Sequence, residues 1–355
     1  MPDTRSFHGC KLDTDLSAPS INDHDAYRQR LADALSILKP KPCPYKMIRL
    51  GGKLDGAYLL PDDLANIEAC FSPGVDNFKN FEDQLTLDHR IACHMCDKSS
   101  DVSKFKTPLI EPGQTFEQSW LDVVDDEDSI SLATWVNKHT NSTSSDLILQ
   151  MDIEGAEYRN ILSTTEALLQ RFRIIVIELH DLTKLEDIEV FNQVLYPSLK
   201  RVDQFFLCVH AHPNNCCGEA VISEHKLNIP RVHELTFLRK DRLSGFDKDQ
   251  LHPVMLPHPL DIKRNVPNTP PLFLREGWLS SERPSESKIK ILEDKLDYQE
   301  HLNRMQKDES RLRKDISRLT KMVEVRDRKI TNMQKSSSWK LSAPVRFLGK
   351  LRQEK

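Results

Sequence analysis

The sequence predicts an α/β domain built on a largely parallel sheet, followed by a C-terminal helix that forms a coiled coil. Two patterns indicate this architecture. Between residues 45 and 240, short apolar and β-branched runs alternate with amphipathic stretches, as expected of strands and helices in turn. From residue 302, apolar residues recur at alternating intervals of three and four. With 355 residues and a mean hydropathy of -0.52, the chain has room for one large globular domain with polar appendages.

Changes in composition divide the chain into five segments. Residues 1–44 are an N-terminal extension with a helical stretch at Ala26–Leu38, which ends before Pro40 because proline lacks the amide proton that a helix needs. Residues 45–240 are the α/β domain. The segment 241–285 holds seven prolines, which favour a strap or a linker over regular structure. The last two segments are the coiled coil, 286–335, and a basic amphipathic tail, 336–355.

The α/β domain contains seven short runs that are candidate strands: Asn66–Ser72, Ile91–Asp97, Ser119–Val123, Asp146–Asp152, Arg173–Leu179, Gln204–His212 and Val232–Lys240. The amphipathic stretches between them are candidate helices, notably Ser129–His139, Glu157–Arg171 and Leu185–Leu199.

The coiled coil is predicted from a seam in which eight of ten positions are apolar: Leu302, Met305, Glu309, Leu312, Ile316, Leu319, Val323, Arg326, Ile330 and Met333. A single helix packed on the domain is the alternative. Residues 286–355 hold 19 Lys and Arg against 11 Asp and Glu, a net charge of +8, so the rest of the chain carries -12 of the total of -4. We therefore expect a homo-oligomer whose basic end suits an anionic surface.

The tail mixes aromatic and apolar residues with basic ones, as in Trp339-Lys340-Leu341 and Arg346-Phe347-Leu348, and could lie in a lipid headgroup layer. A structureless tail is the alternative.

No window approaches the roughly eighteen uncharged apolar residues of a membrane span, and acidic residues interrupt the first thirty positions. Secretion is therefore not expected, the cysteines are interpreted as reduced thiols, and no nucleic-acid partner is expected.

Polar residues gather where the candidate strands end. In open α/β sheets ligands bind outside the carboxyl ends of the strands, so these residues are expected to share one crevice. They are Ser72 and Gly74 with Glu82 after the first strand, Asp97 after the second, Asp152, Glu154 and Glu157 after the fourth, Glu178 and His180 after the fifth, and His212 after the sixth. The acidic run at 152–157 is the most specific of these signals, because Gly155 within it would weaken a helix.

Several of these motifs, in this order, resemble the FkbM-type S-adenosylmethionine-dependent methyltransferases. The residues that carry the resemblance are Arg49–Gly52, Asp55–Pro61, Phe71–Val75 with Phe81-Glu82, Met151–Tyr158, Ile177–His180, His212 with Asn214-Asn215, and Glu234–Phe237. The resemblance covers about residues 45–240. It implies a class I methyltransferase-like (Rossmann-like) sheet of seven strands, of which the final one runs antiparallel. The sequence departs from the family at Ala57, and at Asp76-Asn77 where a further glycine is usual.

The resemblance also implies the cofactor and its contacts. S-adenosylmethionine would place its adenosine over the loop at Ser72 and Gly74, near Glu82, and its ribose on Asp97. The amino-acid end would lie beside Asp152 and Glu154.

Methyl transfer to a sugar hydroxyl requires removal of the hydroxyl proton. His180 or His212 could act as the base, oriented by Glu178 or Asp152, because an unperturbed imidazole titrates near neutral pH. Alternatively, Asp152, Glu178 and His180 could bind a divalent metal ion that activates the hydroxyl. A zinc site made of Cys93, Cys96, Cys216 and Cys217 is not expected.

The tail is similar to the Ser-Trp-(Arg/Lys)-Leu-x-x-Pro-x-Arg ending of bacterial polysaccharide glycosyltransferases. The two resemblances together imply an O-methyltransferase that modifies a cell-surface polysaccharide or a lipid-linked glycan. It would be cytoplasmic and peripheral at the inner face of the plasma membrane. The alternative is a non-catalytic methyltransferase fold whose coiled coil assembles a glycan-synthesis complex.

Overall fold

The structure is a computed structural model that describes residues 24–225, 227–274 and 278, together with single positions between 313 and 335. Residues 1–292 and 293–355 form two separate units. The N-terminal segment 1–23, most of the predicted coiled coil and the tail at 336–355 lie outside the described residues. The described positions between 313 and 335 are helical and exposed. The coiled coil and the tail therefore stay predictions.

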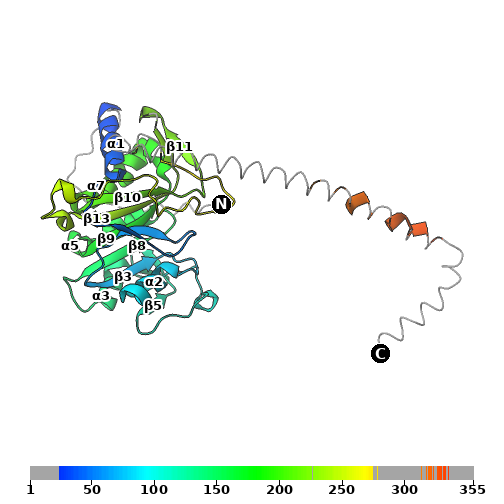
Figure 1. Ribbon diagram of the computed structural model, residues 1–355, viewed down its shortest axis with the longest axis horizontal. Coiled ribbons are helices and arrows are strands. Elements are labelled where there is room, and N and C mark those ends of the chain that lie inside the picture. Colours follow the sequence, from blue (N-terminus) through cyan, green and yellow to red (C-terminus); the bar gives the residue numbers. More distant parts are fainter. Residues whose placement is uncertain are drawn as a thin grey trace. The chain divides into compact units, whose positions relative to one another are not determined.

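The first unit contains the predicted seven-stranded sheet, in the order β10-β13-β9-β8-β3-β4-β5 (Figure 1). Five neighbouring strands are parallel, whereas β13 runs antiparallel to both β9 and β10. The order reverses between β3 and β8, and in open α/β sheets ligands bind outside the carboxyl ends of the strands at such a reversal. The strands are β3 (Ile67–Pro73), β4 (Ala92–Cys96), β5 (Gln114–Glu117), β8 (Asp146–Met151), β9 (Phe172–Leu179), β10 (Phe206–Pro213) and β13 (His233–Arg239).

Each face of the sheet has its own hydrophobic core, because successive side chains of a strand point to opposite faces. Along β8, Leu147, Leu149 and Met151 belong to one core and Ile148 to the other. Helices cover the first core: α1 (His24–Leu38), α3 (Leu132–His139), α4 (Glu157–Ser163) and α7 (Tyr196–Phe205). The second core lies under α2 (Asn80–His89) and an antiparallel hairpin of β1 (Met47–Leu50) and β2 (Tyr58–Pro61).

The structure corrects two of the predicted elements. The run at 119–123 is not a strand of the main sheet. It forms β6 (Trp120–Asp122), which pairs with β7 (Ser129–Ser131) in a separate sheet, and β5 takes the edge position instead. The helix predicted at 157–171 is divided, because Thr165 caps a new helix α5 (Glu166–Leu169) with its side chain. The helix predicted at 185–199 is present with other bounds. It begins with α6 (Ile188–Val190) and continues without a break through a π-helical segment at Phe191–Leu195 into α7.

A smaller hairpin, β11 (Glu219–Ile222) with β12 (Leu227–Pro230), follows β10. After β13 the described part of the proline-rich segment contains two 3-10 turns, at Lys240–Leu243 and Lys248–Gln250, and an isolated β-bridge between His252 and Cys43. Among the described residues, none of the helices combines the length and apolar character needed to cross a membrane.

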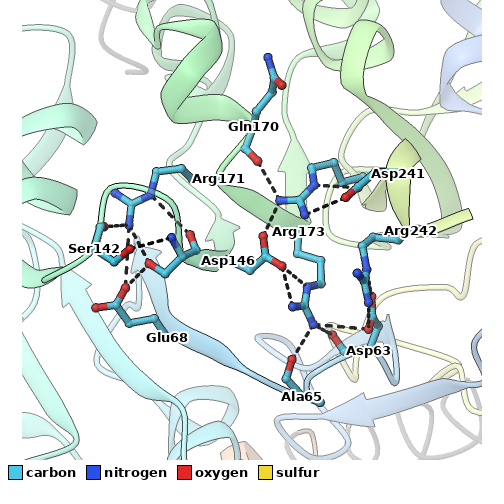
Figure 2. A network of polar contacts seen from close by, with 12 residues as sticks. Asp63, Ala65, Glu68, Ser142, Asp146, Gln170, Arg171, Arg173, Asp241 and Arg242 are labelled. Atoms are coloured by element: carbon cyan, nitrogen blue, oxygen red, sulfur yellow. Dashed lines mark hydrogen bonds and ion pairs between the residues drawn. The ribbon is translucent and has the colours of Figure 1, made fainter. Parts of the chain in front are cut away.

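A network of arginines fastens the strands at the edge of the sheet where β8 and β9 begin (Figure 2). Arg173 donates to Asp146 at 2.6 and 2.8 Å and to the carbonyl oxygens of Asp63 and Ala65 at 2.9 and 2.7 Å. Arg239, at the end of β13, donates to the other oxygen of Asp146 at 2.6 Å. Because Asp146 accepts from both arginines, it ties β9 and β13 to the first residue of β8.

Candidate active site at the carboxyl edge of the sheet

The loops after β3 and β8 cross in direct contact at Gly74. A Cβ atom at this position would lie 1.6 Å from the carbonyl oxygen of Asp152, and the φ angle of Gly74 is +82°. The amide of Gly74 donates to the carbonyl oxygen of Cys96 at 2.9 Å, which adds the end of β4 to the same junction. Only glycine fits where the two loops cross. The crossing therefore brings together the carboxyl ends of β3, β4 and β8.

Asp97 organises the loop that follows β4. Its two carboxylate oxygens accept four hydrogen bonds, from the amide and hydroxyl of Ser99, the hydroxyl of Ser100 and the amide of Asp76, at 2.7 to 3.0 Å. Burial alone would raise the pKa of Asp97, but these hydrogen bonds hold it below its ordinary value. Asp97 therefore lies at the predicted edge, and the protein itself already uses both of its oxygens.

The acidic run after β8 forms a tight turn around Glu157. Glu154 and Gly155 both have positive φ angles, +55° and +100°. Glu157 is fully buried, and its Oε1 accepts from the amides of Ile153 at 3.0 Å and Gly155 at 3.2 Å. These hydrogen bonds stabilise the strained turn. Gly155 lies between acidic residues in this turn because its positive φ angle favours glycine.

His180 lies between the carboxylates of this turn. Its Nδ1 is 3.0 Å from Glu157 Oε1, while its Nε2 is 3.4 Å from Glu154, 3.9 Å from Asp152 and 4.0 Å from Glu178. Burial alone would lower the pKa of His180, but the hydrogen bond and the negative charges around it raise it to about 9. Burial raises the pKa of Asp152 to about 8. The imidazole and the carboxyl of Asp152 thus compete for protons near neutral pH.

A buried chain of hydrogen bonds leads from Asp152 toward α2. Tyr58 of β2 donates to Asp152 Oδ2 at 3.5 Å and accepts from Gln150 Nε2 at 3.2 Å. The hydroxyl of Ser72 contacts both Gln150 Oε1 and Glu82 Oε1. Since this hydroxyl has one proton, it can donate to only one of them. A protonated Glu82 completes the chain, in agreement with burial raising the pKa of Glu82 to about 7.

This arrangement predicts a pH-dependent stability. The pKa of Glu82 in the folded chain, about 7, exceeds the ordinary 4.5, so its stabilising contribution is complete below pH 4.5 and disappears as the pH rises through about 7. The difference corresponds to about 3 kcal/mol. The Glu82→Gln variant keeps a neutral donor and does not titrate. Its melting temperature should therefore exceed that of the parent by a margin that grows from pH 5 to pH 8.5.

Thermal unfolding at the two pH values measures this margin. Glu166→Gln, which removes an exposed carboxyl at the start of α5, is the control and should show a margin that does not change with pH. If the difference in melting temperature between Glu82→Gln and the parent is also the same at both pH values, Glu82 is ionised in the folded protein.

Three acids lie together at the side of the site formed by β9 and β13. Glu178 and Glu234 are opposite each other in the ladder, and Asp55 comes from the loop between β1 and β2. Burial raises the pKa of Glu178 well above its ordinary value and that of Glu234 to about 7. Asn214 and Asn265 donate to these acids.

His212 is at the same edge but has other partners than predicted. Its Nε2 is 3.1 Å from Asn265 Oδ1, and its Nδ1 is 3.8 Å from Asp261 Oδ2. Burial lowers the pKa of His212, but Asp261 and Glu234 raise it to about 9. Neither Asp152 nor Glu178 orients this imidazole, because Asp261 and Asn265 of the proline-rich segment occupy its ring nitrogens.

The predicted residues therefore converge on one edge, with His180, Asp152, Glu154 and Glu178 in mutual contact and Gly74 against Asp152. Ser72 and Glu82 are buried behind this group and pair with each other. The sequence reasoning missed Asp55, Tyr58, Gln150, Asp261 and Asn265. Gln150 and Tyr58 could have been found from polar residues on an otherwise apolar strand face, whereas nothing in the sequence marks the two residues of the proline-rich segment.

Comparison with known proteins identifies the domain. Residues 77–212 match a family model described as the methyltransferase FkbM domain. A variant of the 16S rRNA (adenine(1408)-N(1))-methyltransferase from Catenulisporales acidiphilia is 11% identical over 57% of this chain and 100% of that chain, with a TM-score of 0.27. A putative methyltransferase from Thermoplasma acidophilum is 8% identical over 57% of this chain and 85% of that chain, with a TM-score of 0.25.

Comparison with curated proteins gives no match. The assignment rests on the family model, to which the strand order of the sheet and the acidic site at its carboxyl edge add their support. Residues 77–212 of this chain carry a methyltransferase FkbM domain, and the protein is a methyltransferase.

Proposed function

We propose that the protein is an S-adenosylmethionine-dependent O-methyltransferase that acts on a sugar hydroxyl of a cell-surface polysaccharide or a lipid-linked glycan. The observation that carries the proposal is the contact of His180 with Asp152, Glu157 and Glu178 beside the Gly74 crossing. This arrangement combines a proton acceptor with an acidic surface at the ligand-binding edge of the sheet.

The residues present fit S-adenosylmethionine. When bound, this cofactor supplies an electrophilic methyl group on a positively charged sulfur. Glu157 Oε2 is buried and has no hydrogen-bond partner among the described residues, so the site offers an acceptor atom that these residues do not use. Asp152 and Glu154 would hold the amino-acid end and the backbone at Gly74 would face the adenosine. A ribose on Asp97 would replace one of the four hydrogen bonds that Asp97 accepts.

The pair of His180 and Asp152 is the proposed base. Both groups have a raised pKa, about 9 and about 8, and a base with a high pKa removes a hydroxyl proton more effectively once it is itself deprotonated. Asp152, Glu178 and His180 also lie close enough together to bind a metal ion. We favour the base role, because the hydrogen bond between His180 Nδ1 and Glu157 fixes the imidazole with its Nε2 on the side of Asp152.

The glycan acceptor and the assembly are proposed from the sequence of the C-terminal segments. The seam at residues 302–333 supports a homo-oligomer, and the basic, aromatic tail at 336–355 supports peripheral contact with an anionic membrane surface. The enzyme would then act at the inner face of the plasma membrane, where lipid-linked glycans are built.

The test is incubation of the full chain with radiolabelled S-adenosylmethionine and a lipid-linked glycan extract, followed by mass analysis. We expect label in the glycan and a mass gain of one methylene unit. The Asp152→Asn variant, which keeps the size of the side chain and removes its charge, should lose at least about a hundredfold of this activity. Label in another fraction would contradict the glycan acceptor. Absence of heat on titration with S-adenosylmethionine would favour the non-catalytic scaffold.

A further inference from the structure

Three carboxylates converge under the β1–β2 hairpin, and of these only Glu178 also contacts the proposed base, His180. One carboxylate oxygen each of Asp55, Glu178 and Glu234 lies within 4.8 Å of the other two. Glu178 and Glu234 are 4% and 5% exposed and face each other across β9 and β13, so the sheet itself fixes their separation. Asp55 is exposed and closes the group from the hairpin loop.

Two asparagines hold these carboxylates in place. Asn214 Nδ2 donates to Glu178 Oε1 at 2.9 Å and to Asp55 Oδ1 at 3.3 Å. Asn265 Nδ2 donates to Asp55 Oδ1 at 3.1 Å and to Glu234 Oε1. Each amide thus uses both of its protons on the acids. The amide of Cys216 donates to Asn214 Oδ1 at 2.9 Å, which fixes the orientation of this side chain with its nitrogen toward the acids.

The asparagines leave a buried oxygen without a partner. Glu178 Oε2 has no hydrogen bond among the described residues, although Glu178 is almost fully buried. A buried carboxylate oxygen without a partner is unfavourable, and a bound ion is one way to satisfy it. This atom is the second sign, besides the clustering of the acids, that a ligand belongs here.

The cations near the group are engaged elsewhere. The guanidinium of Arg49 donates to the carbonyl oxygens of Gly52 and Ala57 at 2.8 Å. His212 contacts Asp261 and Asn265, and His180 approaches Glu178 only to 4.0 Å. In the part of the chain that the structure describes, no salt bridge includes Asp55 or Glu234. Among the described residues, the three acids therefore have one ion pair, the 4.0 Å contact of Glu178 with His180, while Arg49 and His212 act on Glu234 only through longer-range attraction.

We propose that Asp55, Glu178 and Glu234 bind a divalent cation of the oxygen-preferring class, such as Mn²⁺, Mg²⁺ or Ca²⁺. The three ligands are all carboxylates, with neither thiolate nor imidazole among them, and this set selects hard cations. Two ligands come from the rigid sheet and the third from a loop, so the site is largely formed before the ion enters. The site shares Glu178 with the group of Asp152, Glu178 and His180 but not its other two residues, and it does not depend on the acceptor of the methyl group.

The experiment is a calorimetric titration of Mn²⁺ into the full chain after treatment with a chelator, with no methyl donor or acceptor present. We expect one saturable site and a rise of the melting temperature with Mn²⁺. Asp55→Asn and Glu234→Gln should each weaken Mn²⁺ binding by at least about tenfold. His180→Gln and Asp152→Asn, which change neighbours of Glu178 and none of the proposed ligands, should weaken Mn²⁺ binding less than Asp55→Asn or Glu234→Gln does.

The outcomes separate this inference from the proposed function, because methyl transfer plays no part in the titration. Asp55 is exposed, and its change to asparagine keeps the size of the side chain. We therefore expect Asp55→Asn to fold even if the buried substitution Glu234→Gln prevents folding. Absence of a Mn²⁺ site in the parent chain overturns the inference. Loss of binding in His180→Gln or Asp152→Asn, with Asp55→Asn unaffected, assigns the ion to the other group and also overturns it.

Discussion

Replacement of Gly74 by alanine should destabilise the domain by about 3 kcal/mol or more and abolish binding of S-adenosylmethionine. The added Cβ would lie 1.6 Å from the carbonyl oxygen of Asp152 and 2.7 Å from its carbonyl carbon. Both atoms are backbone, so the loops after β3 and β8 must separate. This would displace Asp152, and with it the contact to His180. Thermal unfolding should show a loss of about 6 to 12 °C for a domain of this size.

The matched control for Gly74→Ala is Gly245→Ala. Gly245 has a similar φ angle, +88°, but a Cβ there would meet nothing within 4 Å. It therefore reports the backbone penalty alone, about 1 to 2 kcal/mol. Binding of the cofactor, measured by calorimetry, should be unchanged in Gly245→Ala. If the two variants unfold at the same temperature, the loops do not cross at Gly74 as described.

Replacement of Glu157 by glutamine should lower the pKa of His180 by more than one unit, a change of about 1.4 kcal/mol or more. Burial lowers the pKa of His180, but the hydrogen bond to Glu157 and the charge of Glu157, together with the charges of Asp152 and Glu154, raise it to about 9. The amide of glutamine can still accept from the amides of Ile153 and Gly155, so the turn should remain closed. Without the charge, the neutral imidazole predominates at a lower pH.

NMR titration of the His180 ring measures this shift, and Glu154→Gln is the control. Glu154 lies 3.4 Å from the opposite nitrogen of the ring, but its side chain is 87% exposed, so water screens its charge. Glu154→Gln should move the titration by only a few tenths of a unit. Equal shifts in the two variants would mean that burial of Glu157 does not determine the protonation of His180. Glu157→Ala, which removes the acceptor as well, should unfold at a clearly lower temperature.

Six of the seven strands of the sheet could be predicted from apolar runs, because β8 and β9 are buried on both faces and therefore read as continuous apolar segments. The edge strand β5 could not be predicted in this way. Its four residues, Gln114–Glu117, include two polar side chains and a threonine, and pairing with β4 on one side only is enough to order them. The more strand-like run at 119–123 pairs with β7 instead.

Site residues that directly follow strands could be predicted from the sequence. Site residues that come from segments distant in the sequence could not. Asp152, Glu178 and His180 follow strands whose ends must coincide, so their convergence follows from the parallel sheet. Tyr58 reaches Asp152 across 94 residues of sequence, and Asn265 reaches Asp55 across 210. Such contacts depend on how the hairpin and the proline-rich segment fold back over the sheet, and no local pattern of residues encodes this.

The arginine network in Figure 2 divides the work of holding β8 between its two ends. At its start, Asp146 is fixed by charged hydrogen bonds, which link it through Arg173 to the start of β9 and through Arg239 to the end of β13. At its carboxyl end, the backbone of Asp152 packs directly against Gly74 instead. Salt weakens ion pairs and leaves such steric packing unchanged, so the two ends should respond differently to ionic strength.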